Sequence, residues 1–395
     1  MQIDQRNTLI LSIAQGLSIT TTNINMINTG LVGTILSTNS ALATLPLSIQ
    51  FLTIAITLIP VSLLMGKFGR RPMFLLGALS AFIGCLVIVF SIYDRSFSLF
   101  ILGSILLGFS QANQQFYRYA AADNVPINLK SKAISLVLAG GVIAAIVGPE
   151  ISKSSFDFFP DYIYLASYLL AAFIQVLNFI ILLFIKIEKP LPNTNLLRPL
   201  SQILFRKNLL IAIFAAAVGY SLMSFIMTAT PLQIVNVCKL GDEASATVIQ
   251  WHVIAMFAPS FFTGIIIMKF GNKNVMMAGV LLYVISISFA IVGETVLNFW
   301  IALFLCGLGW NFLYVGGSDV IAKSASPEER PKVQGVTDFI IFTFVATGSF
   351  LAGALHNTLG WEVMMFYTTI PIITLFISIL VIKPRNLVLN NSIHQ

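Results

Sequence analysis

Long apolar stretches follow one another along the whole chain and are separated by short polar turns. An α-helix needs about 20 apolar residues to cross the hydrocarbon core of a bilayer. Hydropathy, punctuated by glycine, proline and charged residues, predicts six such helices before a polar stretch at 188–208 and six after it. Their bounds are 8–36, 42–65, 73–92, 97–120, 131–152, 162–186, 209–236, 246–268, 274–293, 298–322, 334–356 and 362–382. The predicted fold is all-α and integral to the membrane, with 12 transmembrane helices.

A basic turn between the second and third predicted helices occurs again in the second half. Lys67-Phe68-Gly69 returns 202 residues later as Lys269-Phe270-Gly271. A second echo pairs Pro126, Lys130 and Lys132 with Pro327, Arg330 and Lys332. The second set is separated by 200 to 201 residues, close to the 202 residues of the first. Two repeats at nearly the same separation indicate parallel six-helix repeats, which place a substrate site at their interface. We therefore predict an N-terminal bundle at 1–187, a cytoplasmic linker at 188–208 and a C-terminal bundle at 209–395.

The cations show which side of the membrane each turn occupies. If both termini are cytoplasmic, only Arg95, Lys153 and Lys239 of the 22 lysines and arginines fall outside, and the other 19 lie in or beside cytoplasmic segments. This bias is the one that the positive-inside rule requires. The pattern predicts a multi-pass protein of the plasma membrane with both termini in the cytoplasm.

Composition excludes several classes of protein. Hydrophobic residues make up 57% of the chain and charged residues only 9%, with a mean hydropathy of +0.91, whereas soluble domains carry about 25% charged residues. Membrane topology explains the net charge of +7, so we expect no nucleic-acid partner. The three cysteines form neither a disulfide pattern nor a metal pattern. The sequence contains no phosphate loop and no catalytic constellation. We expect no enzyme activity, no cofactor and no metal.

The repeated turn resembles the signature of the major facilitator superfamily, G-x-x-x-D-R-x-G-R-R. The stretch 62–71 keeps a cation at Lys67 and the residues Gly69, Arg70 and Arg71, and the stretch 264–273 keeps Gly264, Lys269, Gly271 and Lys273. The resemblance implies two six-helix bundles and a gating role for the loop residues Lys67, Gly69, Arg70, Arg71, Lys269, Gly271 and Lys273. Gly66 and Met268 replace the motif's aspartate, so the carboxylate of the family's usual charge relay is missing.

Three further segments resemble a large bacterial branch of this superfamily with unassigned substrates, among whose candidates are flavin-vitamin transporters. They lie at 117–123, 250–264 and 307–319. The resemblance implies a location in the bacterial inner membrane. It also implies a secondary transporter that moves one small organic solute by alternating access.

In such a fold the first, fourth, seventh and tenth helices line the cavity, and all four carry polar residues. The first helix places Gln15, Ser18, Thr22, Asn25 and Thr29 on one continuous face. The cavity candidates are Gln15, Thr22, Asn25, Gln111, Gln115, Arg118, Ser224, Thr228, Trp310, Asn311 and Tyr314. The alternative is that these groups hydrogen-bond between helices, for about 1 kcal/mol or less each. Arg118 either pairs with Asp123 or Asp319, or extends to the cytoplasmic surface.

Four titratable groups are candidates for coupling transport to protons: Glu150, His252, Asp319 and Asp338. Burial would raise a carboxylate pKa toward neutrality, and histidine titrates near neutrality. The alternative places Glu150 at the outer surface, Asp338 beside Lys332 or Lys323, and His252 as a neutral residue of the core.

Three functions fit these observations. The first is a monomeric secondary transporter of a neutral or anionic, vitamin-like or metabolite-like solute, whose partners are the solute, the lipid bilayer and, as a candidate coupling ion, the proton. The alternative is a proton-coupled efflux antiporter. Such antiporters commonly carry a carboxylate in the first or fourth helix, where this chain has amides and hydroxyls. A membrane receptor or assembly protein without transport is the third, because a fold alone does not fix function.

Overall fold

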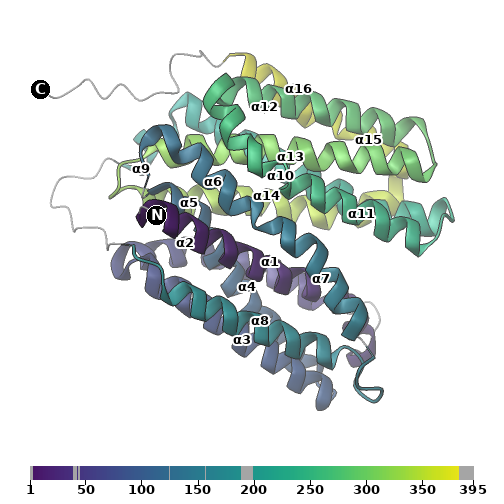
Figure 1. Cartoon of the computed structure of the whole chain (residues 1–395). Helices are drawn as coiled ribbons and strands as arrows, with labels where there is room; N and C mark the ends of the chain where they lie inside the picture. Colours follow the sequence, from purple (N-terminus) through teal and green to yellow (C-terminus); the bar gives the residue numbers. More distant parts are fainter. Residues whose placement is uncertain are drawn as a thin grey trace, which may run out of the picture. The chain divides into compact units, whose positions relative to one another are not determined.

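The computed structural model describes residues 3–38, 42, 45–123, 125–155, 157–187 and 199–381, and within these ranges it contains helices and no strands (Figure 1). In the first half these are α1(Ile3–Leu36), α2(Leu45–Phe68), α3(Arg70–Tyr93), α4(Phe97–Gln114), α5(Tyr117–Asp123), η2(Ile127–Leu129), α6(Lys130–Ala139), α7(Gly141–Ser155) and α8(Leu165–Leu183). After them come α9(Leu200–Leu204), α10(Lys207–Pro231), η3(Leu232–Val237), α11(Asp242–Phe257), α12(Ser260–Val292), α13(Val296–Ser324), α14(Arg330–Leu359), α15(Trp361–Tyr367) and α16(Thr369–Leu380). The all-α integral fold is confirmed.

Nine helices in the described part of the chain are long and apolar enough to cross a membrane. The remaining predicted helices are present but differ locally. The first, α1, carries many amides and hydroxyls, and the fourth is divided into α4 and α5 at Gln115 and Phe116. The eighth comprises α11 and the start of α12, which runs on through a kink at Gly271 into the ninth. Counted this way, the helices correspond to the twelve predicted.

The chain divides into two compact units, and the division does not follow the chain order. The first unit comprises Met1–Asn124 and Val137–Pro192, and the second comprises Val125–Leu136 and Asn193–Gln395. The start of α6 therefore groups with the second unit and its end with the first. The predicted domain bounds stay a prediction; 188–198 of the linker and 382–395 lie outside the described residues.

In the first unit α3 packs along α4 and α8, while α1 packs along α7 and α8 (Figure 1). Two glycines bring the backbones of α1 and the α6–α7 junction into contact. A Cβ atom on Gly140 would lie 2.0 Å from the Ser12 carbonyl oxygen, and one on Gly16 would lie 2.7 Å from the Gly140 carbonyl oxygen. Real Cβ atoms essentially never come this close. Glycine is therefore needed at both positions for the two backbones to approach.

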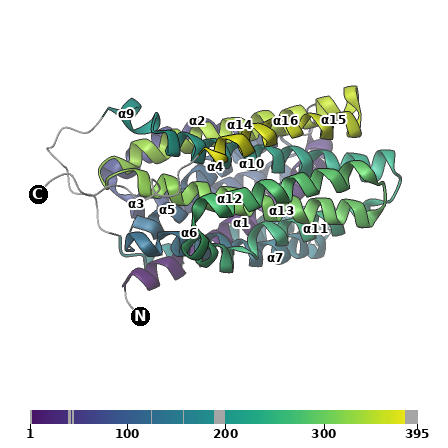
Figure 2. The ribbon, with the colours of Figure 1, turned by 90° about the horizontal axis from the view of Figure 1, so that it is seen from above.

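In the second unit α13 is central and packs against α10, α11 and α12; α12 and α13 run side by side in both views (Figures 1 and 2). The segment Val125–Leu136 contacts α12 at Gly264. A Cβ atom there would lie 2.6 Å from Lys132 Cα, and the Gly264 N–H donates to Ser135 Oγ over 2.9 Å. The glycine lets the start of α6 rest directly on α12.

The repeated basic turn has the same structure in both units. Gly69 (φ 91°, ψ 164°) and Gly271 (φ 80°, ψ 157°) adopt a backbone conformation that is essentially restricted to glycine. Two residues later a cation binds the last turn of the unit's final helix. Arg71 Nη2 donates to the Leu183 carbonyl over 2.8 Å, and Lys273 Nζ donates to the Leu380 carbonyl over 2.9 Å. Cations at a helix C-terminus satisfy carbonyls that lack intrahelical partners.

Candidate functional site

Four helices of the first unit contribute to a chain of uncharged hydrogen bonds. Tyr168 O–H in α8 donates to Asn25 Oδ1 in α1 (2.9 Å), and Asn25 Nδ2 donates to Gln50 Oε1 in α2 (2.6 Å). Gln50 Nε2 donates to Gln111 Oε1 in α4 (2.9 Å), and Gln111 Nε2 donates to Thr22 Oγ1 in α1 (2.7 Å). We call these five residues the amide chain. Each amide both donates and accepts, so the chain holds four helices together without a charge.

A second set of amides lies beside the amide chain. Gln175 Nε2 in α8 donates to Thr21 Oγ1 over 2.7 Å. Asn178 Nδ2, one turn further along α8, donates to Ser18 Oγ over 3.0 Å and to Gln175 Oε1 over 3.1 Å. Both helices thus present a polar face toward each other inside the unit.

A small cavity opens between the two sets. Its volume is about 10 Å³, which is room for about one water molecule. The lining residues are Ser18, Thr21, Thr22, Gln50, Ala81, Leu107, Ser110, Gln111, Gln114 and Gln175. The sequence prediction included Thr22 and Gln111 but missed Gln50, Gln114 and Gln175. An amide in an otherwise apolar helix was the signal for Gln50 and Gln175.

The predicted residues near the α4–α5 break form a cluster of their own. Arg118 is 2% exposed, and its Nη1 donates to the Gln115 carbonyl over 2.9 Å and to Gln115 Oε1 over 3.0 Å. Its guanidinium lies 4.4 Å from the Tyr119 ring centre. Asp123, one of its predicted partners, forms an ion pair with Arg70. Gln15 is buried in α1 at 7% exposure.

In the second unit the predicted polar residues have different surroundings. Asn311 Nδ2 donates to the Met256 carbonyl over 2.7 Å and to Ser260 Oγ over 2.5 Å, while its Oδ1 accepts from Thr263 Oγ1 over 2.6 Å. This amide therefore ties α13 to α11 and α12. On α10, Thr228 is exposed beside Ser349 and Ser224 is half-buried.

Aromatic rings surround Trp310 and Tyr314. These two rings stack at 5.0 Å with 20° between their planes. Tyr220 from α10 meets both edge-on, at 5.3 Å and 5.1 Å. Phe257 from α11 meets Trp310 at 5.6 Å, and Phe342 from α14 meets Tyr220 at 5.4 Å. We call these five residues the aromatic cluster; edge-to-face contacts of this kind are favourable for aromatic pairs.

The four titratable candidates have different surroundings. Glu150 is exposed, whereas His252, Asp319 and Asp338 are completely buried. His252 Nδ1 lies 2.7 Å from the Leu303 carbonyl oxygen. Since a carbonyl only accepts, Nδ1 carries the proton in this contact. Lys323, one predicted partner of Asp338, instead forms an ion pair with Asp319.

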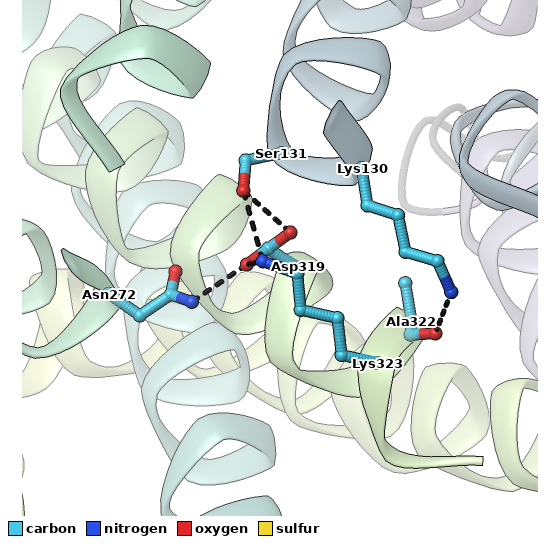
Figure 3. A network of polar contacts seen from close by, with 6 residues as sticks. All are labelled: Lys130, Ser131, Asn272, Asp319, Ala322 and Lys323. Atoms are coloured by element: carbon cyan, nitrogen blue, oxygen red, sulfur yellow. Dashed lines mark hydrogen bonds and ion pairs between the residues drawn. The ribbon is translucent and has the colours of Figure 1, made fainter. Parts of the chain in front are cut away.

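Asp319 lies at the centre of a polar cluster near the end of α13 (Figure 3). Its Oδ1 accepts from Ser131 Oγ over 2.8 Å, and its Oδ2 accepts from Asn272 Nδ2 over 2.7 Å and from Lys323 Nζ over 2.6 Å. Lys130 Nζ donates to the Ala322 carbonyl over 3.1 Å, in the last turn of α13. Together with the hydrogen bond from Gly264 N–H to Ser135 Oγ, these contacts hold the start of α6 against α12 and α13.

In each unit the residue after the glycine of the basic turn binds a carboxylate, but the charge of that carboxylate is neutralised differently. In the first, Arg70 follows the glycine of the basic turn and pairs with Asp123 at the end of α5. In the second, the residue after Gly271 is Asn272, which binds Asp319 as a neutral donor. The cation comes instead from Lys323, one turn further along α13. The gating role of the basic turns stays a prediction.

Comparison with known proteins then fixes the family. The family model described as "Major Facilitator Superfamily" matches residues 11–237 and 237–394. The chain belongs to the major facilitator superfamily. It is 38% identical over 387 residues to the riboflavin transporter RfnT of Brucella anthropi, covering 96% of this chain and 97% of that one. It is also 27% identical over 308 residues to the uncharacterized MFS-type transporter YddS of Bacillus subtilis, covering 73% and 70%.

Solved structures of the superfamily share the fold. The human organic anion transporter MFSD10 aligns with a TM-score of 0.75 at 12% identity, over 95% of this chain and 99% of that one. The transporter FucP in its outward conformation aligns with a TM-score of 0.77 at 14% identity, over 94% and 97%. The protein is thus a multi-pass membrane transporter of a small solute and not an enzyme.

Proposed function

We propose that this superfamily member carries an uncharged, vitamin-like organic solute across the bacterial inner membrane by alternating access, and that riboflavin is the solute to test first. The amide chain carries the proposal, because it offers amide and hydroxyl groups with no charge among them. Binding sites for small molecules use a few placed polar groups to fix orientation. The 38% identity to a riboflavin transporter over nearly the whole chain directs the choice of solute.

Riboflavin matches such groups chemically. Its ring carries carbonyl acceptors and an N–H donor, and its side chain carries hydroxyls, all without net charge. Glutamine and asparagine side chains can pair with either kind of group. A site made of uncharged groups also avoids the cost of burying an unpaired charge. A proton-coupled efflux antiporter, the alternative function, would be expected to carry a carboxylate in the first or fourth helix. The amide chain contains no carboxylate.

Transport by purified protein in liposomes tests the proposal. Vesicles loaded with unlabelled riboflavin should accumulate labelled riboflavin by counterflow, and empty vesicles should not. A pH gradient imposed on the same vesicles tests the proton as coupling ion, for which the buried Asp319, Asp338 and His252 are candidates. Absence of counterflow with riboflavin and with other uncharged vitamins would contradict the proposal and favour the receptor or assembly alternative.

Replacing Gln111 with alanine should weaken riboflavin transport. The substitution removes the link between Gln50 and Thr22, and a lost hydrogen bond to an uncharged group costs about 0.5–1.5 kcal/mol. We expect KM to rise about 3- to 10-fold while the amount of protein in the membrane stays near the wild-type level.

Asn274→Ala is the matched control, because it deletes an exposed amide that bonds only the Phe270 carbonyl of its own helix in the described contacts. Its KM should stay at the wild-type value. A fall in the abundance of Gln111→Ala, with an unchanged KM for the protein that remains, would assign Gln111 to packing.

The proposed orientation places both termini in the cytoplasm and Cys238 at the outer surface. Cys238 is half-buried, whereas Cys85 and Cys306 are completely buried. Desolvation and the nearby Glu294 carboxylate raise the pKa of the Cys238 thiol, and the Gln233 hydrogen bond partly offsets them. Since the thiolate is the reactive form, labelling should be slow at pH 7 and accelerate as the pH rises.

An impermeant maleimide added to intact cells should therefore label Cys238, and Cys238→Ser should abolish the signal. Glu294→Gln should speed the reaction at pH 8, because removing the negative charge lowers the thiol pKa. Labelling only after the membrane is permeabilised would reverse the proposed orientation.

A further inference from the structure

Trp310 has an unusual environment for a tryptophan in the middle of a helix bundle. Its side chain is 1% exposed, and among the described residues its indole Nε1–H has no hydrogen-bond acceptor. The indole N–H is a donor only, and a buried donor left unpaired is unfavourable. The other described tryptophan in the core of this unit, Trp361, donates its N–H to the Ala290 carbonyl over 2.7 Å. The donor of Trp310 is thus available to a group from outside the chain.

The rings around Trp310 define the shape of that group. Tyr314 covers one face of the indole, and Tyr220 and Phe257 present themselves edge-on at 76° to its plane. Tyr314, Phe257 and Phe342 are buried, and Tyr220 is the one member of the aromatic cluster that is partly exposed. Tyr220 is therefore the ring whose displacement opens the edge of Trp310 to a ligand.

We propose that Trp310 and Tyr220 form a subsite for a planar heteroaromatic ring, in which Trp310 Nε1–H donates to an acceptor at the edge of that ring and Tyr220 turns from its edge-on position to stack on the ring's face. This inference rests on the proposed function and names a planar ring as the part of the solute that these two residues recognise. A planar ring replaces the edge-to-face contacts that Tyr220 gives up with stacking of similar strength.

Aromatic clusters also bind cations, so an organic cation is the other class of ligand to compare with an uncharged ring. A quaternary ammonium ion is attracted by the ring faces but has no acceptor for an indole N–H. In this cluster one face of Trp310 is already stacked on Tyr314, and its N–H is the unpaired group. An uncharged ring with a carbonyl or ring nitrogen at its edge can stack on an aromatic side chain and accept from the indole N–H, whereas a quaternary ammonium ion cannot accept that hydrogen bond.

Binding by the full-length protein in lipid nanodiscs tests the subsite, with three probes measured by equilibrium dialysis. Riboflavin carries the ring and the polyol, lumichrome carries the ring alone, and ribitol carries the polyol alone. Trp310→Phe keeps an aromatic ring and loses the N–H. We expect it to weaken riboflavin and lumichrome binding alike, by about 3- to 10-fold, the usual effect of one lost hydrogen bond. Tyr220→Leu, at the partly exposed position, should weaken both probes even if Trp310→Phe folds poorly.

Trp300→Phe is the matched control, since Trp300 lies on the same helix and stacks on Phe304 outside the cluster. It should bind lumichrome as the wild type does. Wild-type affinity for lumichrome in both Trp310→Phe and Tyr220→Leu would overturn the subsite, as would displacement of lumichrome by tetramethylammonium. Binding of lumichrome without riboflavin would refute the proposed solute and leave the subsite standing. Failure to bind either ring would refute both.

Discussion

Gly140→Ala should strongly destabilise the protein. The added methyl group would lie 2.0 Å from the Ser12 carbonyl oxygen and 3.1 Å from the Val137 carbonyl oxygen. Both are backbone atoms of helices, so neither can turn away as a side chain could. Overpacking of this kind costs about 1–3 kcal/mol and occasionally more, and a backbone clash belongs at the upper end. The yield of monodisperse protein in detergent and its thermal midpoint measure the effect.

Gly30→Ala is the control for this substitution, because it makes the same change in α1 where an added Cβ meets nothing within 4 Å. Alanine is about 1 kcal/mol more favourable than glycine inside a helix, so Gly30→Ala should be neutral or slightly stabilising. A Gly140→Ala protein with the yield and midpoint of the wild type would mean that α1 and the α6–α7 junction do not touch as described.

Lys323→Met should cause the second large loss of stability. It leaves the completely buried Asp319 carboxylate without its cation, and breaking a buried ion pair from one side costs about 3–5 kcal/mol. Asp319→Asn should cost less, because the Lys323 side chain is 19% exposed and can reach solvent. The double variant should be more stable than Lys323→Met alone, since the buried charge is then absent. Thermal midpoints of the four proteins give the coupling energy.

Lys269→Met serves as the control, because it removes an exposed lysine whose ammonium lies over the Phe270 ring. Exposed substitutions usually change stability by less than about 0.5 kcal/mol. Equal losses in Lys323→Met and Asp319→Asn, with simple addition in the double variant, would show that the carboxylate does not depend on Lys323 for its burial.

The repeated turn shows which structural features the sequence predicted and which it did not. The 202-residue offset predicted two equivalent turns, and the structure gives both a glycine at positive φ and a cation on the last turn of the final helix. The offset did not show that Arg70 is replaced by Asn272, nor that Lys323 supplies the missing charge. A local motif specifies the turn, whereas a side chain's partner depends on which helix lies opposite.

The amide chain shows the same limit inside one unit. The polar face of the first helix predicted Thr22 and Asn25, and Gln111 followed from the fourth. Gln50 joins these residues and was not predicted, because a lone amide on an apolar helix has no periodicity. Asn311 fitted the same pattern, and its amide likewise bonds neighbouring helices, at Met256, Ser260 and Thr263; its place in the cavity stays a prediction.

The sequence by itself determined that this chain is a membrane protein of twelve helices, with repeated turns and uncharged polar faces. Those properties follow from the bilayer, which requires each spanning segment to be helical, long enough and apolar enough. Length, hydropathy and helical period can all be read within one segment of the sequence. Only the tertiary structure decided that Val125–Leu136 packs with the second unit, that five residues from four helices form the amide chain, and that Trp310 lacks an acceptor among the described residues. These features depend on the rotation of each helix about its axis and on the angle at which it crosses its neighbours. Hydropathy along one segment does not predict either of them.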